Sequence, residues 1–439
     1  MRIFIAILLG FSVTVTKAQE SPKDESGSYK KRVLENTEID VLLNYYSQDG
    51  ENAAVSGGKG TEELTDFSPS IVVSIPLNDD DVLSISGNIS AYTSASSSNI
   101  DPFDGNQPAN PFVASSGASK SDVWSNVIGT YSHSSDDRNQ IWSANLSVSN
   151  EFDYNSVGFG GSYTHLFNEK NTEISFHGNV YIDTWRIIYP RELRPFETGG
   201  DGLNDFLFGK NEITGNTNYN PVFNELSDKG RNSYSAGLNV SQVLSERLQG
   251  MLSADVIMQN GQLSTPFHRV YFSDYADSFI DNFHLADDIE RLPDSRLKIA
   301  VGGRLNYFVN EWISVRTYYR YYTDDWGINS NTASIELPVK ITDKFTLYPS
   351  YRFYNQTAAD YFAPYNTHLS TEKFYTSDYD LSEFNANNYG FGISYTDIFT
   401  SGHIWKFGLK SIDLKYSNYS RNSAFKASII SFGVKFVMD

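Results

Sequence analysis

The sequence contains no cysteine among its 439 residues and only 4 methionines. Without thiols the chain can form neither disulfide bonds nor thiolate metal sites. Beyond its N-terminal segment it also lacks the roughly 20 consecutive apolar residues that a transmembrane helix needs. Basic residues are scarce, with 34 Lys and Arg against 53 Asp and Glu. This balance argues against nucleic acid as a partner, because phosphate binding needs a basic surface.

Aromatic residues and glycine are abundant instead, with 29 Tyr, 29 Phe and 31 Gly. Such usage is typical of β-rich rather than helix-rich proteins. The mean hydropathy of −0.39 argues against a helical membrane protein. It is compatible with a membrane β-barrel, whose strands devote only alternate residues to lipid.

The N-terminus has the features of a signal peptide: Arg2, an apolar run over 3–15, and small residues up to Ala18. No cysteine follows the expected cleavage point, so we expect export without a lipid anchor. The residues that follow are polar and charged. We predict three segments, namely a signal peptide over 1–18, a polar periplasmic segment over 19–36, and an outer-membrane β-barrel over 37–439.

Strict alternation of side chains is the main structural signal. In "NTEISFHGNVYIDTW", residues 171–185, Ile174, Phe176, Val180 and Ile182 share one face of a strand, opposite a polar face. Similar segments recur at lengths that cross a bilayer when tilted. We predict about 16 strands, over 37–48, 66–77, 81–94, 122–134, 139–151, 154–167, 171–185, 232–244, 247–259, 297–309, 311–324, 328–341, 344–356, 387–399, 403–417 and 424–438. In 403–417 the alternation changes phase, which predicts a β-bulge near Lys410 and Ser411.

Short and long connections alternate between these segments. Tight polar turns such as "NDDD" at 78–81 take turns with long loops over 95–121, 186–231, 260–296 and 357–385. The pattern predicts an all-β fold, a transmembrane antiparallel up-and-down barrel with short periplasmic turns and long extracellular loops. A secreted β-sandwich or propeller also alternates apolar and polar residues, but its strands are typically shorter. Aromatic clusters near the strand ends favour the barrel.

Charged residues on the polar faces would line the lumen of such a barrel. The acids fall mostly in the first half of the chain and the bases in the second. Opposed walls of this kind would create a field across the lumen that orients charged solutes. Alternatively, the charges pair with one another or bind a plugging loop. The predicted lumen-lining residues are Glu38, Asp40, Glu173, Asp183, Asp255, Lys298, Arg304, Arg316, Arg320, Lys340, Arg352, Lys406 and Lys410.

No metal site, cofactor or catalytic residue is predicted. The segment "NIDPFDG", 99–105, has oxygen donors but lacks the spacing of a calcium loop. More simply, the acidic loops form a solvated face that could bridge divalent ions to surface polysaccharide. Among seven histidines, His268 invites comparison with Asp324 and Asp325 as a rim pair, yet no nucleophile, zinc or phosphate-binding motif supports an enzyme.

Several stretches resemble a known family of unknown function. It comprises bacterial outer-membrane β-barrels often encoded beside a thioredoxin-like protein, a small lipoprotein and a flavin transferase. The resemblance implies an outer-membrane location and a link to an extracytoplasmic flavin or redox system, without implying any activity or functional residue. The stretches are "YKKRVLENTEIDVLLNYYSQDG", "GGKGTEELTDFSPSIVV", "AYTSASSSNIDPF", "YSHSSDDRNQIW", "STPFHRVYF", "ADDIERLP", "YYRYYTDDWGI" and "FYTSDYDLS".

Two functions remain open at this point. The first is a pore or transporter that lets small polar solutes cross the outer membrane. The second is a plugged barrel that anchors a surface or periplasmic assembly. For the second, the external loops and the N-terminal segment, with its basic "YKKR", are the candidate docking places for a protein partner.

Overall fold

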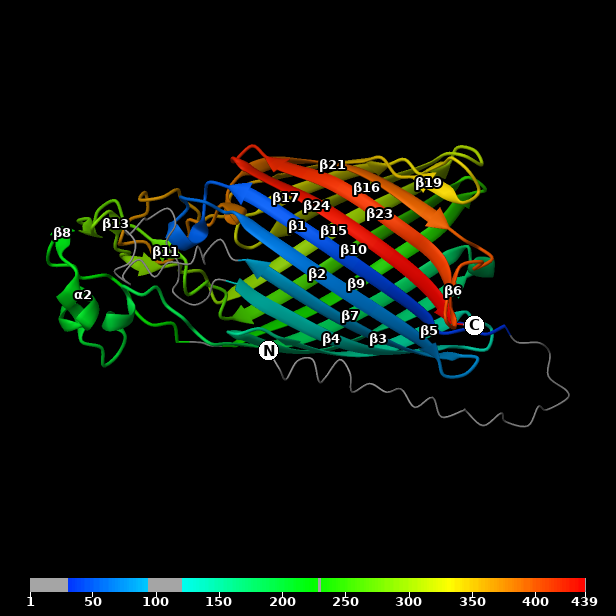
Figure 1. The fold of residues 1–439 in the computed structure, drawn as a ribbon, viewed down its shortest axis with the longest axis horizontal. Helices are drawn as coiled ribbons and strands as arrows, with labels where there is room; N and C mark the ends of the chain where they lie inside the picture. The colour runs from blue at the N-terminus through cyan, green and yellow to red at the C-terminus, as the bar shows by residue number, and fades with distance from the viewer. Residues whose placement is uncertain (1–30, 94–120, 228–229, 439) are drawn as a thin grey trace.

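A closed antiparallel β-barrel of 16 strands forms the body of the protein (Figure 1). The structure is a computed structural model, and it describes residues 31–93, 121–227 and 230–438. Within these ranges no helix is long and apolar enough to cross a membrane. The closed 16-strand barrel confirms the predicted fold class. The predicted signal peptide and the calcium-like segment 99–105 lie outside the described residues.

Each barrel strand pairs with its neighbour in the chain, as an up-and-down topology requires. Two of the 16 strands are interrupted and carry two labels each, β17 with β18 and β19 with β20, while β22 is a short arm that pairs antiparallel with the start of β23. The strands are β1 (Glu38–Gly50), β2 (Leu64–Pro76), β3 (Asp81–Thr93), β4 (Ser121–Ser134), β5 (Gln140–Asn150), β6 (Tyr154–Phe167), β7 (Thr172–Trp185), β9 (Gly230–Ser245), β10 (Leu248–Gly261), β15 (Ser295–Phe308), β16 (Ser314–Asp324), β17 (Asn329–Glu336), β18 (Val339–Lys340), β19 (Phe345–Leu347), β20 (Ser350–Gln356), β21 (Phe384–Thr396), β22 (His403–Ile404), β23 (Phe407–Arg421) and β24 (Phe425–Met438).

The first and last strands close the barrel. β1 pairs with β24 along its whole length, from Glu38 opposite Val437 to Gly50 opposite Phe425. The N–H of Met438 also donates to the carbonyl oxygen of Thr37 at 2.8 Å. The sheet consequently has no free edge, which a membrane-spanning sheet must avoid.

Two prolines interrupt strands that were predicted to be continuous. Pro338 separates β17 from β18, and Pro349 separates β19 from β20. Proline has no N–H to donate to the ladder, so regular pairing stops there. The interruptions face each other, since the N–H of Leu337 donates to the carbonyl oxygen of Pro349.

The predicted β-bulge is confirmed. The register between β23 and β24 shifts between Leu409 and Ser411, so Lys410 has no partner in the ladder. Its carbonyl oxygen instead accepts the N–H of Asp397 at 2.8 Å. The extra residue explains why the alternation in this strand changes phase.

The outer surface of the barrel is apolar, as the alternation in 171–185 predicted. Phe176 is 55% exposed and Ile182 is 51% exposed, and large exposed apolar side chains recur on every side of the barrel. Exposure of this kind would be costly in water, but in a barrel it supplies the face that meets lipid.

The short turns lie at the end of the barrel where β1 begins and β24 ends. The described part of the N-terminal segment packs on these turns: Arg32 Nε donates to Asp79 Oδ1 at 2.7 Å. Arg138 in the next turn donates to the carbonyl oxygen of Lys31 at 2.7 Å. The end of the basic "YKKR" motif thus meets an acid of its own chain.

The long loops at the opposite end fold together into a cap, at the left in Figure 1. We define the cap as residues 51–63, 186–227, 262–294 and 357–383. It contains short elements: η1 (Ala54–Ser56), η5 (Arg194–Phe196), η6 (Gly202–Asn204), α2 (Phe206–Lys210), β8 (Ile213–Gly215), β11 (Arg269–Val270), β12 (Ser278–Ile280), β13 (Phe283–His284), β14 (Asp288–Ile289) and η7 (Tyr379–Leu381), while η4 (Asn168–Lys170) lies in a short turn.

The hydrophobic core of the protein lies in the cap rather than in the barrel. Leu193, Phe283 and Leu285 are completely buried and pack with aromatic residues from the cap segments 186–227, 262–294 and 357–383. The cap is tied to the rim of the barrel, where Arg421 Nη1 donates to Asp380 Oδ1 at 2.6 Å. Sequence reasoning predicted long loops here but not a packed domain.

Candidate functional site

Six arginines follow one side of the barrel from the cap to the short turns. We call them the arginine track. They come from strands β15, β16 and β20, with β17 between the last two, and from the turn before β10. In order from the cap they are Arg296, Arg320, Arg352, Arg304, Arg316 and Arg247.

Three adjoining cavities connect these arginines. The first, of about 330 Å³, contains Arg296 and Arg320. The second, of about 660 Å³, shares Arg320 and adds Arg304, Arg316 and Arg352. The third, of about 400 Å³, shares Arg316 and reaches Arg247. The arginine track therefore borders a nearly continuous row of cavities.

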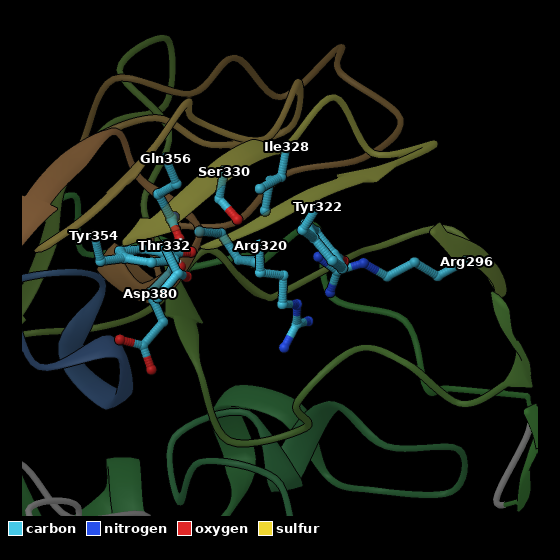
Figure 2. A pocket seen from close by; sticks show the side chains of 10 residues that line it. Arg296, Arg320, Tyr322, Ile328, Ser330, Thr332, Tyr354, Gln356 and Asp380 are labelled. Atoms are coloured by element: carbon cyan, nitrogen blue, oxygen red, sulfur yellow. Dashed lines mark hydrogen bonds between the residues drawn. The ribbon is translucent and has the colours of Figure 1, made fainter. Parts of the chain in front are cut away.

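The first cavity lies where the cap meets the barrel wall (Figure 2). Figure 2 shows Arg320 between Thr332 and Tyr322, with Asp380 of the cap next to Thr332 and Tyr354. Arg296 is held by Asp324, whose Oδ2 accepts from Nη2 at 2.5 Å. The first cavity therefore lies between the cap and the larger second cavity.

Most arginines around the larger cavity have no carboxylate partner. Arg316 pairs with Glu336 at 2.9 Å. Among the residues that the structure describes, Arg304, Arg320 and Arg352 form no ion pair, although Arg304 stacks on Tyr318 at 5.2 Å. Their guanidinium groups are exposed to solvent and keep all five N–H donors available in a planar fork that suits anions.

The predicted acids, in contrast, are mostly neutralised by nearby bases. Glu38 binds both Lys410 at 2.9 Å and Lys435 at 2.6 Å. Asp40 also contacts Lys435, at 3.4 Å.

The acids of β7 and β10 have local partners too. Asp183 accepts from Arg231 at 2.8 Å, and Asp255 contacts His177 at 3.1 Å. Glu173 forms no ion pair with any described residue. Three of the five predicted acids, Glu38, Asp40 and Asp183, are therefore paired with a lysine or arginine.

Four predicted bases lie apart from the second cavity, namely Lys410, which binds Glu38, and three further lysines. Lys298 is on β15 opposite Asp324 in the register. Lys340, in β18, pairs with Asp343 at 2.9 Å. Lys406 lies in the turn between β22 and β23, exposed over the ring of Trp405, rather than within the predicted strand 403–417.

The cap holds a second candidate site, formed by His268, Glu290 and Asp378. One ligand atom from each lies within 4.8 Å of the others. His268 Nδ1 is 3.5 Å from Glu290 Oε2. Glu290 also accepts the N–H of Thr265 at 2.7 Å and the hydroxyl of Thr376 at 2.6 Å.

Burial changes the pKa values of two residues in this cluster. It disfavours the charged imidazole of His268, but the Glu290 carboxylate outweighs that effect, so the pKa of His268 is raised. Burial raises the pKa of Asp378 to about 6. Asp324, in contrast, binds Arg296 and the backbone N–H groups of its own turn. The comparison of His268 with Asp324 as a rim pair is thus replaced by a cluster that the sequence analysis missed.

The sequence carried a faint signal for this cluster. Its three residues belong to "STPFHRVYF", "ADDIERLP" and "FYTSDYDLS", which are among the stretches that support the family resemblance. The three residues are up to 110 positions apart in the sequence, so their proximity in space could not be predicted. Folding of the loops brings Asp378 to His268.

Comparison with solved structures finds outer-membrane proteins at very low identity. A bacterial polysaccharide outer-membrane secretin matches with a TM-score of 0.41 and 9% identity, over 91% of this chain and 98% of that one. A Pseudomonas aeruginosa FadL homologue matches with a TM-score of 0.39 and 11% identity, over 92% and 91%. A BenF-like porin from Pseudomonas fluorescens Pf-5 matches with a TM-score of 0.38 and 8% identity, over 92% and 100%.

These likenesses are too distant to support a function, and no curated protein matches the chain in sequence. The closed 16-strand barrel and its apolar outer face identify a multi-pass protein of the outer membrane, in contact with lipid. The model of the family described as "Protein of unknown function (DUF3570)" matches residues 12–424. The chain belongs to the DUF3570 family.

Proposed function

We propose that the barrel is a pore or transporter through which small polar solutes, and anions in particular, cross the outer membrane. The observation that carries the proposal is the arginine track with its three adjoining cavities. Because alternate residues of a barrel strand point to opposite faces, the arginines of β15 and β16 lie opposite the lipid-facing Leu305 and Tyr319. We therefore place the arginine track on the lumen wall.

Electrostatics supports anions over cations. Arg304, Arg320 and Arg352 surround the second cavity without ion-pair partners among the described residues, while the acids of β1, β7 and β10 are mostly paired. A wall with unpaired cations concentrates anions near it and raises the barrier for cations. The field across the lumen that the sequence suggested would then come from this one wall.

Conductance in a planar lipid bilayer tests the proposal. Purified full-length protein should form stable channels, and a salt gradient should give a reversal potential of the sign expected for anion selectivity. Protein that inserts as a folded barrel but conducts no ions would contradict the pore. Channels that prefer cations would contradict the role of the arginine track.

A plugged barrel that anchors an assembly is the second candidate, and the cap favours it. Loops that only surround a pore need no core, whereas this cap buries twelve hydrophobic residues in one cluster. A rigid surface of this kind suits recognition of a partner outside the cell. Silent barrels in the conductance experiment would favour this reading.

The ends of the chain complete the proposal. Residues 1–18 would direct export and be removed, and residues 19–36 would remain in the periplasm. The contact between Arg32 and Asp79 supports a segment that rests on the short turns. It leaves the external cap as the surface through which a protein partner would bind.

A further inference from the structure

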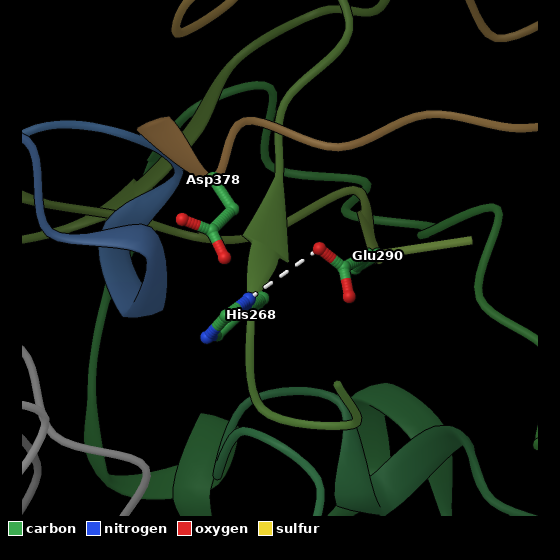
Figure 3. A group of neighbouring side chains, drawn as sticks. All are labelled: His268, Glu290 and Asp378. Carbon is green, nitrogen blue, oxygen red and sulfur yellow. Dashed lines mark hydrogen bonds and ion pairs between the residues drawn. The ribbon is translucent and has the colours of Figure 1, made fainter. Parts of the chain in front are cut away.

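We propose that His268, Glu290 and Asp378 bind a divalent transition-metal ion of the Zn²⁺ type. The ion fastens two cap loops, residues 262–294 and residues 357–383, to each other. Figure 3 shows both carboxylates turned toward the imidazole ring.

The spacing of the three side chains fits a shared ion better than a direct hydrogen bond. His268 Nδ1 and Glu290 Oε2 are 3.5 Å apart, at the outer limit for hydrogen bonding. Two ligands of a tetrahedral zinc ion lie roughly 3.4 Å apart, given metal bonds of about 2.0–2.2 Å. Since no two of the three ligand atoms are more than 4.8 Å apart, a small inward movement of Asp378 completes the site.

The carboxylates are held in place by neighbouring donors. Glu290 is fixed by Thr265 and Thr376, as described above. Asp378 Oδ1 accepts the N–H of Asp380 at 2.9 Å, and its other oxygen forms no hydrogen bond with a described residue. Metal ligands in proteins are usually oriented by such outer hydrogen bonds.

Charge balance also favours a divalent cation. The site joins two carboxylates and one imidazole, and the Glu290 side chain is only 2% exposed. Buried carboxylates are costly unless a cation compensates them, and a divalent ion would neutralise both. The imidazole nitrogen selects zinc-like ions over Ca²⁺, which takes six to eight oxygen ligands.

The ion would also couple the cap to the barrel. Asp378 lies two residues before Asp380, which pairs with Arg421 at the rim of the barrel. Asp380 also borders the first cavity of the arginine track. Metal binding would therefore hold a cap loop in place at the entrance of that cavity.

Metal titration of the intact protein tests the inference. Purified full-length protein in detergent is stripped with a chelator and titrated with Zn²⁺ by calorimetry, and with Co²⁺ by visible absorption. We expect one equivalent to bind and Co²⁺ to give the intense bands of tetrahedral coordination. His268→Ala and Asp378→Asn should each weaken binding at least tenfold. Asp281→Asn, a change in an exposed turn of the cap, should bind like the wild type.

Hydrogen exchange gives a second readout that does not depend on the variants. Zn²⁺ should slow exchange in both 262–294 and 357–383 of the wild-type protein. Heat-dependent electrophoretic mobility verifies that each variant still forms a barrel. The inference is overturned if the wild type binds no stoichiometric Zn²⁺ or Co²⁺, if His268→Ala binds as tightly, if Ca²⁺ displaces Zn²⁺, or if exchange changes in only one loop.

Discussion

Arg269 donates from Nε to Glu192 Oε1 across 2.6 Å, and both side chains are completely buried in the cap. A second hydrogen bond joins Nη2 to Glu192 Oε2 at 3.1 Å, so the pair is bidentate. Arg269 Nη1 also donates to the carbonyl oxygen of Val55 at 2.9 Å. One guanidinium group thus connects three separate segments of the cap.

Glu192→Gln should destabilise the cap by about 3–5 kcal/mol, because it leaves the Arg269 charge buried without its partner. Hydrogen exchange of the cap segments measures this loss, while the barrel should keep its heat-dependent mobility. Glu212→Gln, at an exposed position in the same loop, serves as control and should have little effect. Equal protection of the cap in both variants would refute the role assigned to the pair.

The sidedness of β7 can be tested with two adjacent residues. Val180→Arg puts a charge on the lipid face near the middle of the strand. It should destabilise the barrel folded in vesicles by about 2–4 kcal/mol. Asn179→Arg puts the same charge on the opposite face, beside Gly160, and should cost little. Urea titration followed by tryptophan fluorescence gives both values. Similar costs at both positions would show that Asn179 does not face water.

Charge reversal in the arginine track should change ion selectivity. In Arg316→Glu combined with Arg320→Glu, the second cavity loses two cations and gains two anions. The reversal potential in a salt gradient should then move toward cation preference. Lys170→Glu, in a short turn, should leave it nearly unchanged. A conducting double variant with wild-type selectivity would remove these arginines from the lumen wall.

Asp287 should make the cap sensitive to pH. Burial raises the pKa of its carboxyl to about 7, with Asp277, Asp274 and Asp288 adding smaller effects. Between roughly pH 4 and pH 7 the folded cap keeps a proton that the unfolded chain has lost, so stability falls as pH rises. The shift corresponds to as much as about 4 kcal/mol.

Asp287→Asn stays neutral and still accepts the N–H of Phe272, which Asp287 accepts at 2.8 Å. The wild-type cap should therefore open more readily at pH 8 than at pH 5, while the variant should change much less. Hydrogen exchange of 270–272, corrected for intrinsic rates, compares the two. A variant with the full wild-type dependence would point to another titrating group.

The barrel was predictable from sequence because its information is local. A period of two, tight polar turns and a shift of phase at Lys410 each depend on a few consecutive residues. The breaks at Pro338 and Pro349 were missed, although proline removes the donor that a continuous strand needs. The alternation also assigned each charged side chain to one face of the barrel wall, but it could not predict which of these side chains form ion pairs.

The cap was not predictable, because its contacts join residues far apart in the chain. Glu192 meets Arg269 across 77 positions, and Asp378 reaches His268 from another loop. Irregular loops have no periodicity that announces which side chains are buried. The arginine track was partly predictable. Four of its arginines were predicted individually from the alternation, but the cavities that they share depend on strand register.

The hydrogen-bonded seam between β1 and β24 has a consequence for biogenesis. Glu38 lies opposite Val437, so the ladder that seals the sheet joins the two most distant parts of the described chain. Pairings between residues so far apart in the sequence form slowly. The chain between them must first close into a large loop, and the hydrogen bonds that offset this loss of entropy form only afterwards. Until then β1 keeps an open edge, and we expect the whole chain to be delivered to the membrane before the cylinder can seal.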